Sequence, residues 1–187
     1  MALRICKAVI KDNRTISSAR TVEQLIEFIK PLLIDDEQGG REEPFEFEEG
    51  QECVARIIHM ISHKTNADIY YDLLLRFKKI FARGGLNRQK YTYPALTFSL
   101  IRLSVFVNYP PQNAVEEEEV KQDPEDGEEA EEPEPAPTVQ VNQLRIFKDL
   151  SVMINTLQSQ HPEQALRLNL QACQAINNLS EVSALED

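Results

Sequence analysis

The segment from Ile69 to Gly85 combines an amphipathic helical pattern with a clear stop signal. Apolar residues recur there at intervals of three and four, which places them on one face of a helix. These residues are Ile69, Leu73, Phe77, Ile80 and Phe81. A glycine after the last periodic residue can adopt the left-handed conformation that ends a helix. We therefore expect a helix through Phe81 that stops at Gly84 and Gly85.

A second apolar segment follows this stop. Thr92 and Pro94 are typical of a helix start, because a Thr hydroxyl can cap free amides and proline costs little in the first turn. The residues from Ala95 to Val107 fit a helix, but part of this segment also alternates as a strand does. We expect a helix, because the neighbouring segments are helical.

The remaining segments also show helical start signals. Thr21 with Gln24, and Thr65 with Asp68, match capping boxes. Pro162 is expected to begin the last full helix.

Four further apolar stripes have the helical period. The expected buried positions are Val22, Leu25, Ile26, Ile29, Leu32 and Leu33; Val54, Ile57, Ile58 and Ile61; Val141, Leu144, Phe147, Leu150, Ile154 and Leu157; and Leu166, Leu170, Cys173 and Ile176. We expect Pro31 to kink its helix and the residues from Asp35 to Gly50 to form a polar loop.

Successive amphipathic helices with short connections predict an all-α fold, an α-solenoid of HEAT-like antiparallel helix pairs. We expect a helical-repeat segment over residues 1–108, its continuation over 140–187, and an insertion over 109–139. A solenoid unit buries its apolar face only against neighbouring units. Leu3 to Val9 is already apolar and periodic, and Ser180 to Leu185 begins a new amphipathic turn. We therefore expect exposed apolar surface at both ends, and self-association unless something covers it.

The acidic charge of the chain is concentrated in the insertion. Residues 110–138 hold twelve acidic residues against one lysine, which equals the net charge of -11, and six of the ten prolines. A segment so charged and so poor in apolar residues is typical of disorder. It is either a solvated tether or an acidic docking segment for a basic partner. The rest of the chain is neutral, which argues against nucleic-acid binding.

The chemistry-bearing residues do not form a recognisable catalytic motif. His59 and His63 have the spacing of two zinc ligands on a helix, but Met60 stands where a metalloprotease has its general base. The glycine pairs do not match a phosphate-binding loop. We expect no catalytic residue, no metal and no cofactor. A zinc hydrolase would need a third ligand to converge with the two histidines.

Composition favours a cytosolic protein. No apolar run approaches the ~18 residues of a membrane span, and the N-terminus lacks a secretory signal pattern. Cys6, Cys53 and Cys173 are far apart and odd in number, which is typical of reduced thiols.

The glycine joint resembles that of the vacuolar protein sorting-associated "thirty-five" family, the large helical-solenoid subunit of retromer. The residues that carry the resemblance are Phe81, Gly84, Gly85, Arg88, Lys90, Tyr91, Thr92, Pro94, Leu96 and Phe98. Three flanking stretches resemble the family in the same order: RTISSARTVEQLIEFIKPLLIDD, GQECVARIIHMISHK and RIFKDLSVMINTLQSQHPEQALRLNLQA. The resemblance covers nearly all of the chain apart from Tyr109 to Thr138, and family members are several times longer.

The resemblance implies a non-enzymatic scaffold in the retromer coat, on the cytosolic face of endosomes. Family members help to recover cargo receptors toward the Golgi or the plasma membrane. They hold an arrestin-like subunit at the N-terminal end and a metallophosphoesterase-fold subunit at the C-terminal half. This chain resembles the start of that half, so the arrestin-like contact is not carried over and the phosphoesterase-like contact is expected to be incomplete.

The family motif supplies candidate partner contacts. They are Gly84, Gly85, Arg88, Lys90, Tyr91, Thr92 and Pro94. These residues either contact a partner or shape the turn. A generic helical-repeat adaptor unrelated to retromer is the alternative function.

Overall fold

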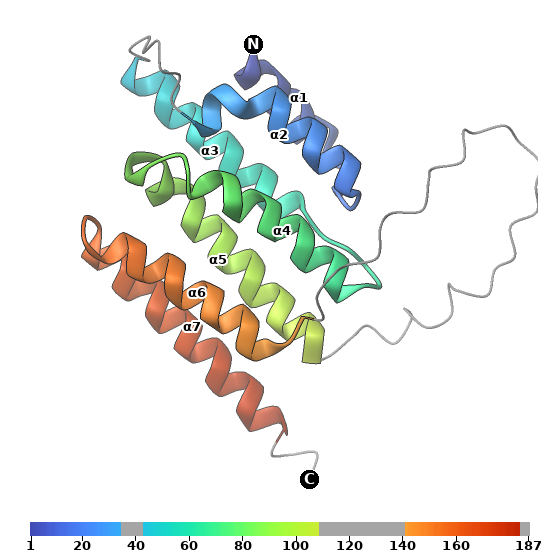
Figure 1. Cartoon of the computed structure of the whole chain (residues 1–187), viewed down its shortest axis with the longest axis vertical. Helices are drawn as coiled ribbons and strands as arrows, with labels where there is room; N and C mark the ends of the chain where they lie inside the picture. The colour runs from blue at the N-terminus through green and yellow to red at the C-terminus, as the bar shows by residue number, and fades with distance from the viewer. Residues whose placement is uncertain (35–42, 109–140, 184–187) are drawn as a thin grey trace, which may run out of the picture.

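The chain forms a stack of helices, and the fold is an all-α solenoid. The computed structural model describes residues 1–34, 43–108 and 141–183. The helices in these ranges are α1 (Ala2–Asp12), α2 (Ala19–Leu33), α3 (Pro44–Met60), α4 (Ala67–Phe81), α5 (Leu86–Asn108), α6 (Gln143–Gln158) and α7 (Pro162–Ser183). In Figure 1 they follow one another from the N-terminus at the top to the C-terminus at the bottom.

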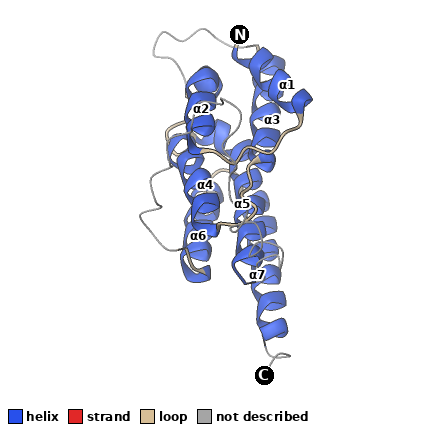
Figure 2. Cartoon of the chain, turned by 90° about the vertical axis from the view of Figure 1, so that its right-hand side faces the viewer, coloured by secondary structure: helices blue, strands red, loops and turns tan. Residues whose placement is uncertain are grey.

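The helices lie in two layers. Figure 2 shows α2, α4 and α6 in one layer and α1, α3, α5 and α7 in the other. The helix α5 contacts α3 and α7 within its own layer, and α4 and α6 across the core. Leu73, Phe77, Leu96 and Leu100 are almost completely buried between the layers. This arrangement confirms the prediction of stacked antiparallel pairs.

The central helix α5 settles the ambiguity between helix and strand. The residues from Ala95 to Val107 are helical, as expected. The predicted start is wrong, however, because α5 begins at Leu86, and Thr92 and Pro94 lie inside it. The helix α4 agrees with the prediction and ends at Phe81 before the two glycines.

Both predicted capping boxes are wrong. The helix α2 begins after Ser18, so Thr21 lies within its first turn. The residue before α4 is Asn66, whose side-chain oxygen accepts from Asp68 N at 2.9 Å and Ile69 N at 3.0 Å. An asparagine oxygen caps the free amides as well as a threonine hydroxyl does. The residue that caps α4 is therefore Asn66, one position after the predicted Thr65.

The helix α3 begins within the segment expected to be a loop. Residues 35–42 lie outside the described ranges, but the predicted loop is wrong from Pro44 to Gly50, which belong to α3. Proline is favourable in the first turn of a helix, where its missing N–H costs nothing. Pro31 lies inside α2, and the kink expected there stays a prediction.

The linkers between helices also contact each other. Ile16, between α1 and α2, pairs with Ile61, which follows α3. Ile16 N donates to Met60 O at 3.0 Å, and Ser62 N donates to Ile16 O at 3.1 Å. This isolated bridge holds the first helix pair against the second.

The predicted stripe of α7 is wrong, because the helix buries an adjacent side. The side chains that pack inward are Ala165, Leu168, Ala172 and Leu179. By contrast, Leu166 and Leu170 are 60% and 61% exposed. Small alanines allow α7 to approach α5 and α6 closely, whereas the larger leucines dominate a sequence-based estimate of the apolar face. The turn expected to start at Ser180 is the continuation of α7 to Ser183.

The predicted face of α6 is correct in its second half only. Leu150, Ile154 and Leu157 are buried as expected, but Leu144 is 67% exposed and Ile146 takes its place. The acidic insertion expected over 109–139 lies outside the described residues. Val141, the first described residue after it, donates its backbone N–H to Asp68 Oδ1 at 2.5 Å.

Candidate functional site at the joint between α4 and α5

The turn between α4 and α5 requires glycine at two positions. A Cβ atom on Gly84 would overlap the carbonyl oxygen of Leu33, which is the last residue of α2. Gly85 has φ +76°, a conformation that glycine adopts without the steric cost of a side chain. Gly85 O then accepts from Arg88 N and Gln89 N at the start of α5. The two glycines therefore serve different purposes, close packing on α2 and reversal of the chain.

The side chain of Gln89 fastens the two helices together. Its Nε2 donates to Phe81 O at 3.2 Å and lies 3.5 Å from Ala82 O, at the end of α4. No N–H group of α4 donates to these carbonyls, because the helix stops there. Phe81 O also accepts from Gly84 N at 3.1 Å in the turn. Gln89 is 4% exposed, so this interaction is part of the interior. The sequence reasoning missed Gln89, although its position in the first turn of α5 would have indicated the role once that start was known.

Arg88 holds the end of α2 against the joint. Its Nη1 donates to Leu32 O at 2.9 Å, and Gln51 Nε2 donates to the same oxygen at 2.8 Å. The guanidinium carbon of Arg88 lies 4.9 Å from the centre of the Phe47 ring. A cation near the C-terminus of a helix is favoured by the helix dipole. Arg88 is 5% exposed, so it fixes three helices rather than facing a partner.

Pro94 creates a free carbonyl that α7 satisfies. A proline inside a helix cannot donate to the carbonyl four residues earlier, which here belongs to Lys90. Gln164 Nε2 donates to Lys90 O at 2.8 Å. Thr92 does not cap the helix, because its Oγ1 donates to Arg88 O at 3.1 Å. The contact from α7, distant in sequence, explains why the helix continues through Pro94.

Lys90 and Tyr91 form the accessible side of the joint. Both are half-buried, and Lys90 Nζ lies 4.7 Å from the centre of the Tyr91 ring. The Tyr91 hydroxyl donates to Glu48 Oε1 at 3.1 Å, and its ring meets the Phe47 ring edge-on at 6.3 Å. Phe45, in the first turn of α3, is 77% exposed. Among the predicted motif residues, Lys90, Tyr91 and Pro94 are the ones with half-buried side chains, whereas Arg88 and Thr92 are buried.

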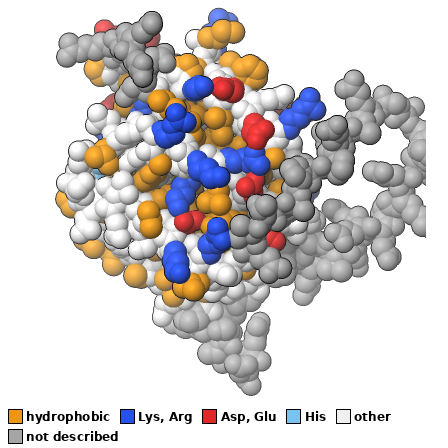
Figure 3. Space-filling model, in the orientation of Figure 1, with side chains coloured by type: hydrophobic (Ala, Val, Ile, Leu, Met, Phe, Trp, Pro, Cys, Tyr) orange, Lys and Arg blue, Asp and Glu red, His pale blue; other side chains and the backbone are white. Residues whose placement is uncertain are grey.

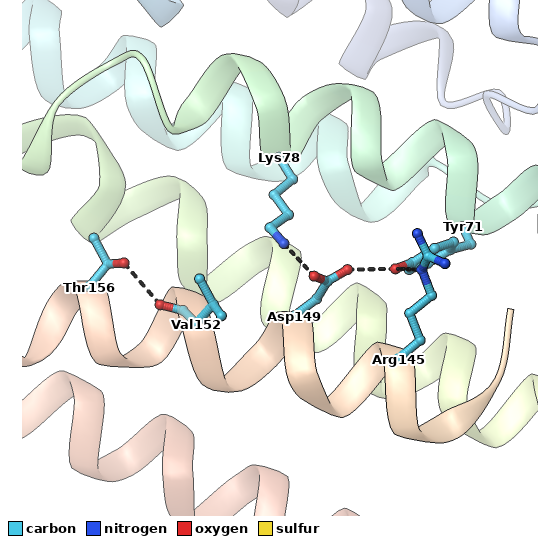
Figure 4. A network of polar contacts seen from close by, with 6 residues as sticks. All are labelled: Tyr71, Lys78, Arg145, Asp149, Val152 and Thr156. Atoms are coloured by element: carbon cyan, nitrogen blue, oxygen red, sulfur yellow. Dashed lines mark hydrogen bonds and ion pairs between the residues drawn. The ribbon is translucent and has the colours of Figure 1, made fainter. Parts of the chain in front are cut away.

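A polar network that the sequence reasoning missed joins α4 to α6. In Figure 4, Asp149 lies between Lys78 and Tyr71. Lys78 Nζ is 2.5 Å from Asp149 Oδ1, the Tyr71 hydroxyl donates to Asp149 Oδ2 at 2.6 Å, and Arg145 Nε donates to the Tyr71 oxygen at 3.0 Å. Burial first, and then the hydrogen bond to Asp149, raise the pKa of Tyr71 to about 12. The network keeps Tyr71 protonated and holds the two helices side by side.

The surface of this layer carries mixed charges. Figure 3 shows blue Lys and Arg side chains gathered near the middle of the face, with red carboxylates among them. Arg76 pairs with both Asp72 and Glu23, which links α4 to α2. Paired charges of this kind bind no nucleic acid backbone strongly, because the carboxylates compete for the cations.

The two candidate zinc ligands do not share a helix. The helix α3 ends at Met60, so His59 lies in its last turn and His63 follows it. His63 Nδ1 accepts from Asn66 N at 3.0 Å, directly before α4. No group of three or more potential metal ligands occurs among the described residues. The helical geometry that motivated the zinc hypothesis is therefore not formed.

The cysteines have two kinds of environment. Cys6 and Cys53 are buried and Cys173 is exposed, all as free thiols. Burial, with a smaller contribution from Cys53, raises the pKa of Cys6 to about 12. Burial also raises the pKa of Cys53.

No described helix is long and apolar enough to cross a membrane.

Two layers of stacked antiparallel helices, held together by a buried joint, define an α-solenoid protein. The chain belongs to the family described as Vacuolar protein sorting-associated protein 35, whose model matches residues 1–186.

Curated relatives agree with this assignment. Vacuolar protein sorting-associated protein 35A of Arabidopsis thaliana is 30% identical over 184 residues, covering 97% of this chain and 21% of the relative. Protein 35B of the same plant is 32% identical over 182 residues, covering 95% and 20%. The chain thus spans about a fifth of the length of these relatives. The comparison with solved structures produced no match.

Proposed function

We propose that this chain is a non-enzymatic scaffold segment of the retromer cargo-recognition complex. Membership of the vacuolar protein sorting family over residues 1–186 is the observation that carries the proposal. Its role is in protein transport from endosomes to the Golgi and to the plasma membrane, at the cytosolic face of the endosome. A two-layer helical stack suits this role, because it offers extended surfaces to partners.

The proposed partner is the metallophosphoesterase-fold subunit of retromer, contacted through part of its full binding site. The accessible side of the joint supports a contact there, because Lys90 and Tyr91 combine a cation with an aromatic ring. Phe45 adds an exposed aromatic side chain on α3, the helix whose Phe47 contacts Tyr91. Aromatic and basic side chains are enriched at the centres of protein interfaces. The remaining motif residues shape the joint and position these side chains. The acidic segment over 109–139 is proposed as a solvated tether between the two helical parts.

Titration calorimetry of the chain with the phosphoesterase-like subunit tests the proposal. The positive control is the matching fragment of a full-length relative. We expect saturable binding that falls roughly tenfold when Lys90→Ala and Tyr91→Ala are combined. The matched control is Lys148→Ala, because Lys148 is an exposed lysine on α6, away from the joint. It should bind as the unchanged chain does.

Two outcomes would contradict the proposal. If the helical chain gives no heat while the control fragment binds, the fold exists without this contact. A generic adaptor function would then be favoured. If Lys148→Ala weakens binding as much as the joint variant does, the contact lies elsewhere on the solenoid.

A further inference from the structure

A cavity of about 240 Å³ lies between α1 and α3, which are neighbours within one layer (Figure 2). We call it the α1–α3 cavity. Its lining residues are Lys7, Ile10 and Lys11 of α1 with Glu49, Glu52, Cys53 and Arg56 of α3. Most of the charged members of this set are exposed, so the cavity opens to solvent. Lys90 and Tyr91 are not part of it, and it is therefore separate from the contact proposed at the joint.

The helical period brings the lining residues together. On each helix they recur at intervals of three and four, which places them on the side that faces the other helix. Lys7 Nζ lies 2.6 Å from Glu49 Oε1, and this ion pair fixes the two helices relative to each other. Cys53 is 7% exposed and Ile10 is half-buried, so they form the inner wall. The α1–α3 cavity thus combines a charged rim with a less polar interior.

The rim carries an excess of positive charge. Lys7 and Glu49 neutralise each other through their ion pair. In the described part of the chain, no ion pair or hydrogen bond involves Lys11, Glu52 or Arg56. Two cations and one carboxylate therefore remain around the same cavity. Like charges at short range repel each other, and an anion with a single charge between the two cations would remove this repulsion.

We propose that the α1–α3 cavity binds the carboxylate of a glutamate or aspartate side chain in an acidic peptide segment of another protein. The Arg56 guanidinium can donate two parallel hydrogen bonds to a carboxylate, and the Lys11 ammonium can donate a further one. The methylene groups of the bound side chain would pack against Ile10 and Cys53.

The charge and the size of the α1–α3 cavity select this ligand class. A phosphate group carries close to two negative charges at neutral pH, and the carboxylates of Glu49 and Glu52 would repel the second one. The volume of about 240 Å³ is also below the roughly 300–1,000 Å³ of sites that enclose a drug-sized ligand or a cofactor. It suits one anchoring side chain of a partner.

NMR titration of the ¹⁵N-labelled chain tests the site. The probe is the peptide acetyl-Gly-Gly-Glu-Gly-Gly-amide, whose only charge is the glutamate carboxylate. We expect saturable shifts at the amides of Ile10 and Cys53, with a dissociation constant of about 1 mM for this single anchor. The same peptide with glutamine in place of glutamate should give no saturable shift. Inorganic phosphate should bind at least about tenfold more weakly than the glutamate peptide, because of its second charge.

Two substitutions remove the cations that the site needs. Arg56→Gln and Lys11→Gln should each weaken binding of the glutamate peptide at least about tenfold, because a hydrogen bond to a charged group is lost. Both side chains are exposed, so the fold should be kept, and circular dichroism checks this. The matched control is Arg20→Gln, since Arg20 is an exposed arginine of α2 in the other layer. It should bind as the unchanged chain does.

Cys53 provides an independent readout. It lines the α1–α3 cavity, whereas Cys6 is completely buried. The glutamate peptide at about nine times its dissociation constant should slow alkylation of Cys53 by iodoacetamide about tenfold, because only the unoccupied chain reacts. The glutamine peptide should leave the rate unchanged. Mass spectrometry locates the label on Cys53.

Four results would overturn the inference. One is a helical chain that shows no saturable shift with the glutamate peptide up to ~10 mM, well above the expected dissociation constant. Another is equal binding of the glutamine peptide or of phosphate. A third is an Arg20→Gln variant that loses as much affinity as Arg56→Gln. The last is an alkylation rate at Cys53 that the glutamate peptide does not change.

Discussion

The joint between α4 and α5 and the outer side of α7 use their side chains in opposite ways. At the joint, Arg88 and Gln89 are buried and donate to carbonyls at the ends of α2 and α4. On the outer side of α7, Leu166 and Leu170 are mostly exposed and do not pack into the interior. This difference shows that the buried motif residues mainly hold neighbouring helices of the solenoid together.

The largest effect is expected at Gly84. Gly84→Ala should lower the free energy of unfolding by about 3 kcal/mol, because its Cβ forces α2 and the joint apart. Gly85→Ala is the control at the adjacent position, where space is open and the cost is the positive φ alone, about 1 kcal/mol. Urea unfolding measures both. Equal losses would show that close packing against Leu33 is unimportant.

The buried arginine should have the next largest effect. Arg88→Met keeps much of the side-chain volume but removes the donor to Leu32 O, so we expect a loss of about 2 kcal/mol. Lys90→Met, at the accessible side of the joint, should change stability by less than about 0.5 kcal/mol. If the two variants unfolded alike, Arg88 would not fasten α2.

Tyr71, in the network between α4 and α6, and the buried Cys6 of α1 predict a loss of stability at high pH. The pKa of Tyr71 rises from 10.0 to about 12 on folding, and that of Cys6 from 9.0 to about 12. The unfolded chain therefore releases these protons first, and stability present below pH 9 is lost as the pH rises toward 12. Urea unfolding across this range measures the effect.

The matched variant for this pH effect is Tyr71→Phe. It should be about 1 kcal/mol less stable near neutral pH, because it lacks the hydrogen bond to Asp149. It should also lose less stability above about pH 10, because it has no hydroxyl to ionise at that position. A pH dependence identical to that of the unchanged chain would contradict the assignment.

The smallest effect concerns the carbonyl freed by Pro94. Gln164→Leu should cost about 1 kcal/mol, because Lys90 O loses its donor. The same change should cost less in a Pro94→Ala background, where the substituted residue has a backbone N–H that can donate within α5. A double-mutant cycle measures this coupling. Full additivity would show that Gln164 does not compensate for the proline.

Much of the fold could be predicted from the sequence. The helix through Phe81, the stop at Gly84 and Gly85 and the buried stripe from Val54 to Ile61 follow from local periodicity and glycine chemistry, which act over a few residues. The start of α5 at Leu86 could not be predicted from these local patterns. The Thr-x-Pro pattern indicates a local helix start, whereas the helix passes through Pro94 with help from Gln164.

The candidate site was predictable only as a position in the chain. The motif marks the joint, but Gln89, Gln51 and Gln164 contribute through contacts that depend on how distant helices pack. The inward face of α7 was missed for a related reason. Periodicity identifies the leucine stripe, but the choice between that stripe and Ala165 with Ala172 depends on the shape of α5 and α6.

Urea unfolding of matched variants tests the contrast between the joint and the outer side of α7 most directly. Gly84→Ala should lower the free energy of unfolding by about 3 kcal/mol, because a Cβ atom there overlaps the carbonyl oxygen of Leu33. Leu166→Gln and Leu170→Gln should each change it by less than about 0.5 kcal/mol, because both side chains are mostly exposed. Equal losses at Gly84 and at the two leucines would contradict the account.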